Sequence, residues 1–456
     1  MPTKRHTSAT YTERIKARHE AGREARHRAP RRALGEWDRA ARSIDALEAL
    51  EAQNTIRAAD LLPIRYGRMS QSPWTYYRGA AAVMAADLAT RPHSGLDVQL
   101  CGDAHILNFG LWATPERHLA FDLRDFDETL PGPFEWDVLR LAASIVVLAR
   151  ADGLPEATAQ HAVRAAVDAY RDRMALYAAE GTLEIWYDRI DAEQLVAHFG
   201  DTARRQVVAA IEKGTRHRTQ HAAFEKLVTE TGDGYRIVEN PPKLTHFDIP
   251  GVMDAVTEVF ALYSETLQDD RRHCLEQFEV CDVARQVVGV GSVGMRVHLL
   301  LLMGRNGRDP LFLQVKQAGP SVYEAHLGPS RYDNHGARVV HGMRLIQSAT
   351  DMFVGWTRFR DHDYYVRQFR DMKIIADSAR IAPVVADFAT ACGDALAKSH
   401  ARSGDPVAIS GYIGRSSAFT DAAAEFAEGY ADQTEADHAQ LLDAIAHGTV
   451  TADADA

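Results

Sequence analysis

The spacing of hydrophobic positions along the chain changes twice. In the first half, apolar residues recur at helical intervals over 78–90, 134–153 and 155–181, which predicts buried or amphipathic helices in these three segments. Between the first two lie the short apolar runs "DVQLC" (97–101) and "HLAFDLRDF" (118–126), which are typical of strands. Residues 182–275 continue as a mostly helical and polar stretch.

A block rich in β-favouring residues follows. Residues 278–318 alternate apolar runs with glycine-containing turns, and "GRNGRDP" (304–310) predicts a hairpin. Further strands are expected within 351–359 and 363–373, before helical patterns return over the last 70 or so residues. The pattern predicts one β-rich region between two helical ones.

This order of elements predicts an α+β fold with two lobes. We expect a basic N-terminal helical arm over 1–54, a helical lobe over 55–275 and a β-rich lobe over 276–375. The C-terminal helices, 376–456, should return to complete the helical lobe.

Charge is distributed unevenly. The chain carries a formal net charge of −11, but residues 1–42 hold twelve Lys and Arg against five Asp and Glu. A basic arm of this kind contacts nucleic acid or a phosphate-bearing partner in some proteins, and in others it is a solvated, partly helical tail. We favour the tail because no aromatic-rich nucleic-acid motif accompanies it, and the acidic remainder argues against a nucleic-acid enzyme.

The chain has no apolar run of 18 residues and no signal-peptide pattern. We therefore expect a cytoplasmic protein with no membrane partner. Its four cysteines form no C-x-x-C pair, which argues against both a disulfide framework and a structural zinc site.

Candidate chemistry begins at "VQLCGDAHILNFG", residues 98–110. Asp103 follows the expected strand, and Asn108 comes five positions later. A carboxylate at a strand end can orient a hydroxyl group and accept its proton, and an amide oxygen is a hard ligand suited to Mg²⁺. The interval matches the D-x-x-x-x-N spacing of a kinase catalytic loop.

A second acidic stretch, "FDLRDFDET" (121–129), follows the next expected strand. Asp125 there is the candidate for the main metal ligand, and Asp127 and Glu128 are candidates for helping to hold a second ion. An Asp-rich turn without a metal is the alternative, but the pairing with Asp103 and Asn108 favours the metal. His105 is a weaker candidate ligand, because no second histidine lies nearby at ligand spacing.

The β-rich block contains "GVGSVG", in which Gly289, Gly291 and Gly294 have G-x-G-x-x-G spacing. Alone, this motif is weak evidence for a nucleotide-binding site. In a dinucleotide-binding fold a helix would follow the glycines, whereas here the strand-like "MRVHLLLLM" follows. A glycine-rich loop between two strands favours the kinase type of phosphate cover, so these glycines are candidates for nucleotide binding.

Lys316 ends the next strand-like run, "LFLQVK", and is the candidate for binding nucleotide phosphates. A lysine at a strand end is more often simply solvated, but its place downstream of the glycines favours the functional role. Glu324 is a candidate ion-pair partner that would orient it. Four further cations are candidates for contacting phosphates, although a surface or carboxylate-paired role is favoured for each: Arg65, Arg68, Arg78 and Arg367.

These motifs support a resemblance. "CGDAHILNFG" resembles the H-G-D-x-x-x-x-N loop of aminoglycoside and choline phosphotransferases, members of the protein-kinase-like superfamily, with Cys101 in the place of their histidine. Over about residues 55–440 the chain is similar to a bacterial family catalogued as domain of unknown function 2252. The resemblance implies a kinase-like fold, but the order is reversed, since the catalytic loop precedes the glycine-rich loop. We therefore expect a circular permutation.

The resulting hypothesis is an ATP- and Mg²⁺-dependent phosphotransferase. Asp103 and Lys316 would be the catalytic residues, Asn108, Asp125 and Asp127 the metal ligands, and the acceptor a small molecule rather than a protein. Two alternatives stay open: a metal-dependent phosphoester hydrolase that uses Asp103, His105, Asp122, Asp125 and Asp127, and a catalytically silent nucleotide-binding module.

Overall fold

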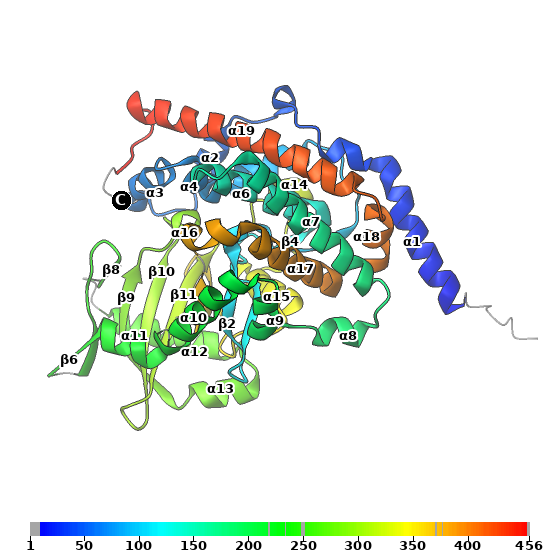
Figure 1. Cartoon of the computed structure of the whole chain (residues 1–456). Coiled ribbons are helices and arrows are strands. Elements are labelled where there is room, and N and C mark those ends of the chain that lie inside the picture. The colour runs from blue at the N-terminus through cyan, green and yellow to red at the C-terminus, as the bar shows by residue number, and fades with distance from the viewer. Residues whose placement is uncertain are drawn as a thin grey trace, which may run out of the picture.

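The computed structural model describes residues 10–217, 219–232, 234–247, 251–369, 372–375 and 377–453. These residues form a mixed α+β fold in which neighbouring strands pair antiparallel. Helices fill the upper part of Figure 1, and the large sheet lies at its lower left. No helix in the described ranges combines the length and the apolar character needed to cross a bilayer.

The largest sheet has the strand order β12-β13-β11-β10-β9-β8. Its strands are β8 Leu244–Thr245, β9 Phe278–Gln286, β10 Val297–Gly304, β11 Pro310–Ala318, β12 Gly355–Phe359 and β13 His362–Gln368. The predicted hairpin is confirmed, because the Gly304 amide donates to the Asp309 carbonyl across the turn between β10 and β11, at 2.8 Å. Every residue of β11 is buried, as expected of a strand covered on both faces.

Helices from the preceding segment provide much of that cover. They are α11 Gln220–Leu227, α12 Val252–Ser264 and α13 Asp269–Leu275. Tyr263 of α12 packs with Leu313 of β11 in one apolar cluster, and Ala223 of α11 packs with Phe312 in another. The β-rich unit therefore begins well before residue 276, and the expected lobe boundary falls inside a packed unit.

A second sheet, of order β14-β2-β3-β5, carries the acidic motifs, and β1 pairs separately with β4. The strands are β1 Asp97–Leu100, β2 Phe109–Ala113, β3 Leu119–Leu123, β4 Leu130–Pro133, β5 Ile190–Asp191 and β14 Ile374–Ile375; a further hairpin joins β6 Val228–Thr231 to β7 Gly234–Ile237. Phe109 pairs with Leu123. Antiparallel pairing therefore places the residues just before β2 beside those just after β3.

The helical region is built around α6, which is buried from Phe134 to Ala149. The helices before the large sheet are α2 Ala46–Asn54, α3 Leu62–Met69, α4 Pro73–Gly79, α5 Ala81–Ala89, α6 Phe134–Ala151, α7 Glu156–Tyr177, α8 Thr182–Tyr187, α9 Ala192–Ala197 and α10 Asp201–His217. The helices expected over 134–153 and 155–181 are confirmed as α6 and α7. The one expected over 78–90 is divided at Ala80 between α4 and α5.

The C-terminal helices pack back on this region. They include α14 Glu324–Leu327, α15 His335–Ile346, α16 Ser378–Ile381, α17 Val385–Ser403, α18 Pro406–Ile413 and α19 Ala418–Ala446. α17 lies along α7, and α19 crosses the top of Figure 1. A Cβ atom on Gly393 of α17 would lie 2.0 Å from the Ala166 carbonyl oxygen, so only glycine permits this approach.

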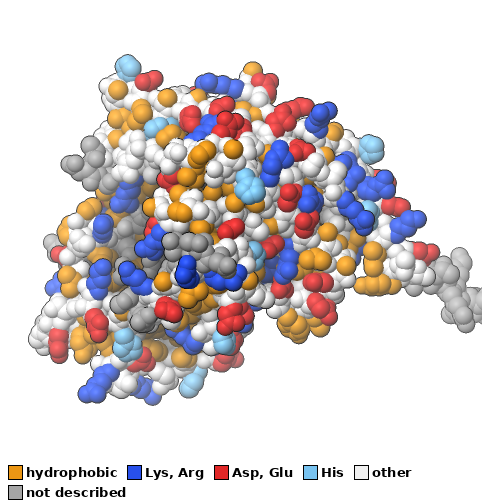
Figure 2. All heavy atoms as spheres, viewed as in Figure 1, with side chains coloured by type: hydrophobic (Ala, Val, Ile, Leu, Met, Phe, Trp, Pro, Cys, Tyr) orange, Lys and Arg blue, Asp and Glu red, His pale blue; other side chains and the backbone are white. Residues whose placement is uncertain are grey.

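The N-terminal arm is not a free tail over its described length. Helix α1 (Tyr11–Arg28) packs against α18, and basic side chains gather along it in Figure 2. Arg26 donates to the carbonyls of Gly411 and Tyr412, at 2.6 and 2.8 Å, and Arg31 donates to that of Ile413. These arginines satisfy carbonyl groups that the end of a helix leaves unpaired. Most of α1 is exposed, as expected of a solvated, helical arm, but Arg26 and Arg31 fix this segment to the end of α18.

Candidate active site

The first acidic loop leaves β1 through Gly102, which has a φ of +84°. A Cβ atom there would lie 2.3 Å from the Glu128 carbonyl oxygen, so the turn requires glycine. Asp103 follows, and its Oδ1 accepts from Arg140 Nε of α6 at 2.8 Å. Burial raises the pKa of Asp103, while Arg140 opposes this shift. Oδ2 lies 3.9 Å from His105 Nε2.

A buried aspartate that the sequence analysis missed holds this loop in place. Asp137 of α6 accepts from the amide of Cys101 at 2.7 Å and from that of Gly102 at 3.0 Å. His400 of α17 lies against the same carboxylate, at 3.3 Å. A carboxylate in the apolar run "FEWDVLRLAAS" is the signal that could have identified it, since a buried charge needs partners.

Asn108 joins the two acidic loops. Its Nδ2 donates to the carbonyls of Asp103 and Asp125, at 2.9 and 3.0 Å, and its Oδ1 accepts from the Asp125 amide at 2.9 Å. The β2–β3 register explains this contact, since it places position 108 beside position 124. The side chain is buried and its amide oxygen keeps one further lone pair, so the predicted role as a metal ligand stays a prediction.

Lys316 of β11 meets the second acidic loop. Its Nζ lies 3.4 Å from Asp125 Oδ1 and forms an ion pair with Asp127 Oδ2. Asp127 also accepts from the hydroxyl groups of Tyr365, at 2.8 Å, and Ser292, at 3.2 Å. Residues almost two hundred positions apart thus form one cluster of charges.

The charges in this cluster stabilise one another. Burial opposes ionisation of Asp125, but Lys316 and Arg367 outweigh it and hold the pKa of this carboxyl group well below its usual value. Burial likewise opposes protonation of Lys316, and the carboxylates of Asp125 and Asp127 raise its pKa above the usual value. Both groups are therefore charged at neutral pH.

The structure pairs Lys316 with these aspartates and not with Glu324. Glu324 accepts from the amides of Ser321 and Ser330, at 2.9 and 3.2 Å, and lies 3.5 Å from Arg338 Nε. The hypothesis that it orients Lys316 is wrong, because these contacts direct its carboxylate to the turn around α14. The ion-pair partner of Lys316 is Asp127, in the loop after β3.

The glycine-rich loop connects the antiparallel strands β9 and β10, as its flanking runs predicted. Gly289 and Gly291 line the same cavity as Lys316. Gly294 has a φ of +94°, and a Cβ atom on it would lie 2.8 Å from that of Arg57. Arg57 donates to the Gly291 carbonyl at 3.0 Å and to that of Val293, which holds the loop in place.

These parts enclose a cavity of about 230 Å³, which we call the Lys316 cavity. Its charged or titratable lining residues are Arg78, Asp103, His105, Asp125, Lys316 and Arg367. Burial lowers the pKa of His105 well below its usual value, and the neighbouring arginines lower it further, so this histidine is neutral.

The four candidate arginines are in different environments. Arg65 is buried and donates to Gln53, Asn54 and the Gly79 carbonyl, and Arg68 donates to the Val288 carbonyl. Arg367 faces the cavity and donates to Gln314 Oε1 and the Arg124 carbonyl, at 3.3 and 3.2 Å. Arg78 has no hydrogen bond or ion pair among the described residues, and its Nε is buried without a partner. Its guanidinium lies over the Trp74 ring, 5.9 Å from the ring centroid, and interacts electrostatically with Asp103 and Asp125.

The oxygen ligands at this site suit a metal ion that binds together with substrate phosphates and water. Within the described part of the chain, no group of three or more His, Cys, Asp or Glu side chains could hold a metal ion by itself. Mg²⁺ is commonly bound through one or two carboxylates together with substrate phosphates and water. Asp125 faces the Lys316 cavity and has a side chain that is 43% exposed, so it fits this kind of site.

Asp122, which the hydrolase alternative uses, lies outside this cluster. It is fully buried, forms an ion pair with Lys398 of α17, and accepts from the Ser348 amide at 2.9 Å. Its carboxylate therefore has a structural role between β3 and α17.

Comparison with known families gives one match. Residues 57–444 match the model of a family described as an uncharacterized protein conserved in bacteria (DUF2252). The match spans most of the chain, so the protein belongs to this family, as the resemblance implied. No curated protein and no solved structure matches the chain.

Proposed function

We propose that this member of the bacterial family is an ATP- and Mg²⁺-dependent phosphotransferase with a circularly permuted, kinase-like catalytic site. The observation that carries the proposal is the contact between Lys316 Nζ and Asp125 Oδ1, at 3.4 Å. It joins a basic strand residue, a glycine-rich loop and two acidic loops around one cavity. A site for a nucleotide polyphosphate and its metal ion needs cationic groups for the phosphates and carboxylates for the metal at one place.

The cavity has groups for each part of that ligand. Lys316, Arg78 and Arg367 would bind phosphate oxygens, and Arg78 has donors free to do so. The glycine-rich loop lets the backbone approach the phosphates closely. Asp125, with Asn108 beside it, would hold Mg²⁺, which when bound neutralises charge on the phosphates.

Asp103 would orient the acceptor and take its proton. Arg140 binds Oδ1, so Oδ2 is the atom left to accept a hydrogen bond from an acceptor hydroxyl or amine. Burial favours proton uptake by this carboxylate, which suits a general base, and Arg140 stabilises its ionised form in the resting site. The small cavity favours a small acceptor group over a folded protein surface.

The position of α17 supports the permutation. In an ordinary kinase order, a helix precedes the strand that leads to the catalytic loop. Here Ser403, the last residue of α17, accepts from the Gln99 amide of β1 at 3.0 Å. The end of this late helix therefore lies beside the start of the early strand, so a reordered chain can build the same site.

The proposal is tested by titrating the purified protein with ATP, with and without Mg²⁺, in a thermal-shift assay. We expect stabilisation that requires both, and transfer of the γ-phosphoryl group from labelled ATP to a small-molecule acceptor. Asp125→Asn should abolish the Mg²⁺ requirement together with transfer. Hydrolysis of a phosphoester without ATP would instead support a hydrolase, and ATP binding without transfer to any acceptor would support a silent module.

A further inference from the structure

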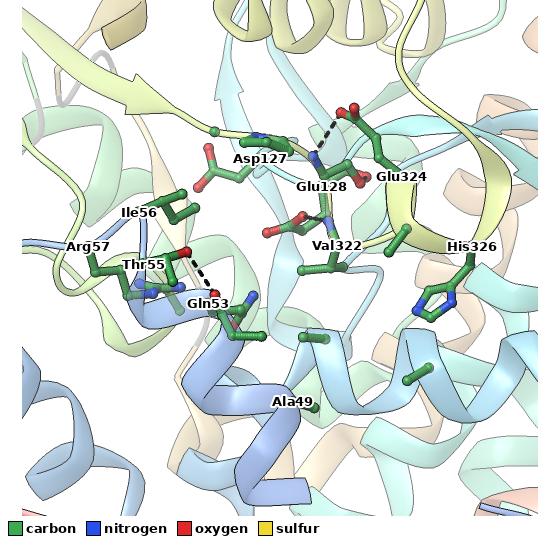
Figure 3. A pocket seen from close by; sticks show the side chains of 18 of the residues that line it. Ala49, Gln53, Thr55, Ile56, Arg57, Asp127, Glu128, Val322, Glu324 and His326 are labelled. Atoms are coloured by element: carbon green, nitrogen blue, oxygen red, sulfur yellow. Dashed lines mark hydrogen bonds between the residues drawn. The ribbon is translucent and has the colours of Figure 1, made fainter. Parts of the chain in front are cut away.

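A second, larger cavity adjoins the Lys316 cavity. Its volume is about 640 Å³, and we call it the Glu128 cavity. Helix α2 and the chain that follows it form one wall, and the segment from the end of β11 to α14 forms the other, together with Asp127 and Glu128 (Figure 3). The proposed chemistry assigns this cavity no organic ligand.

The two cavities have one wall in common. Gly291 of the glycine-rich loop lines both of them. Asp127 lines the larger cavity, while Lys316, its ion-pair partner, lines the smaller one. A ligand that occupied both would pass this loop and this ion pair, close to Asp125, the proposed metal ligand, which lies two residues before Asp127.

The cavities differ in size and in lining. Sites for drug-sized ligands commonly measure about 300–1,000 Å³, a range that includes the Glu128 cavity and excludes the Lys316 cavity. The smaller cavity has three cationic side chains, which suit phosphates. The larger has mainly apolar walls, with Ala49, Ile56, Met295 and Val322 among its lining residues. An uncharged planar group gains most from burial between such walls.

Polar side chains also line the larger cavity, among them Gln53, Thr55, Arg57, Glu128 and His326. Glu128 Oε2 accepts from the Val322 amide at 2.7 Å, and its other oxygen accepts no hydrogen bond from any residue that the structure describes. Figure 3 shows this carboxylate directed into the cavity, on the side of Thr55 and Ile56. A carboxylate accepts hydrogen bonds from sugar hydroxyl groups, as acidic residues do in other nucleotide sites.

We propose that the Glu128 cavity binds the nucleoside of the nucleotide whose phosphates lie in the Lys316 cavity, with the base between the apolar walls and the ribose hydroxyls on Glu128. This placement rests on the proposed function for the presence of the nucleotide. The nucleoside would thus lie on the α2 and α14 side of the glycine-rich loop.

The test compares two probes, Mg·ATP and Mg·tripolyphosphate, by calorimetric titration of the full chain. Ala52 lines the Glu128 cavity on α2 and is exposed, so Ala52→Trp adds bulk to the cavity without a change in the core. Ala151, at the exposed end of α6, lines neither cavity, and Ala151→Trp is the matched control. Glu128→Gln tests the ribose contact.

We expect Ala52→Trp to weaken Mg·ATP binding on the order of tenfold or more, which corresponds to ~1.4 kcal/mol, and to leave Mg·tripolyphosphate binding unchanged. Glu128→Gln should weaken only Mg·ATP, and Ala151→Trp neither probe. If the wild-type protein binds Mg·ATP and Ala52→Trp binds it equally well, the nucleoside lies elsewhere and the placement is overturned while the proposed function stands. If the wild-type protein binds neither probe, the proposed function fails, and the placement fails with it.

Discussion

Lys316 and Asp127 form an ion pair although 189 positions separate them in the chain. The lysine side chain is 3% exposed and the aspartate 26%, so the pair lies at the inner wall of the candidate site. It joins the β-rich unit to the loop after β3. The same lysine is expected to bind phosphates, and this double role determines what its substitution should do.

Lys316→Met should lower both stability and transfer. The variant leaves Asp125 and Asp127 without their cation, and we expect a loss of about 2 kcal/mol in the free energy of unfolding, between the values for surface and fully buried pairs. Urea denaturation measures this. Lys316→Met combined with Asp127→Asn should lose less than the sum of the two single variants. Strict additivity would show that the two residues do not interact in solution.

Asp103→Asn should separate chemistry from binding. The amide keeps an oxygen for Arg140 but cannot take a proton, so transfer should fall on the order of 10²- to 10⁴-fold. The thermal shift produced by Mg·ATP should persist, because the phosphate-binding cations are unchanged. Full transfer by this variant would exclude Asp103 as the base.

Arg78→Gln should weaken nucleotide binding with little cost in stability. Arg78 forms no hydrogen bond within the described residues, so its removal breaks none. Its loss should lower the affinity for Mg·ATP by about 1.5–3 kcal/mol, the range for a hydrogen bond to a charged group.

Arg68→Gln is the comparison for this variant, since Arg68 donates to the Val288 carbonyl at 2.6 Å. It should lower the melting temperature more than Arg78→Gln does. Unchanged affinity in Arg78→Gln would contradict a role in phosphate binding.

Glu135 should make stability depend on pH. Burial raises its pKa from 4.5 to about 7, against the opposing hydrogen bonds from Ser94. Between these values the folded state binds more protons than the unfolded state, so the free energy of unfolding falls as pH rises through this window. The full effect is on the order of 3 kcal/mol.

Glu135→Gln removes the titration and keeps an oxygen for the Ser94 amide. Chemical denaturation at pH 5 and pH 8 should show a smaller loss of stability in this variant than in the wild-type protein. Equal losses in the two proteins would place the responsible group elsewhere.

Much of the local structure could be predicted from the sequence. Helical periodicity located α6 and α7, and β-favouring runs with turn residues located β9, β10 and β11. These predictions succeed because each element buries one face or all of its faces, so its apolar residues recur with the period of that helix or strand. The D-x-x-x-x-N spacing and the acidic motif after the next strand are also local, since one hairpin register joins Asn108 to Asp125.

The tertiary structure alone decided which charges meet. Asp127 lies in the turn between β3 and β4 and Glu324 at the start of α14, and nothing in their neighbouring residues distinguishes the one that reaches Lys316. Arg65, Arg68 and Arg78 likewise look equivalent in the sequence, yet the packing of α3 and α4 leaves Arg78 Nε without a hydrogen bond among the described residues. The physical reason is that hydrophobic periodicity is set within one element, whereas an ion pair depends on how separate elements are placed relative to one another.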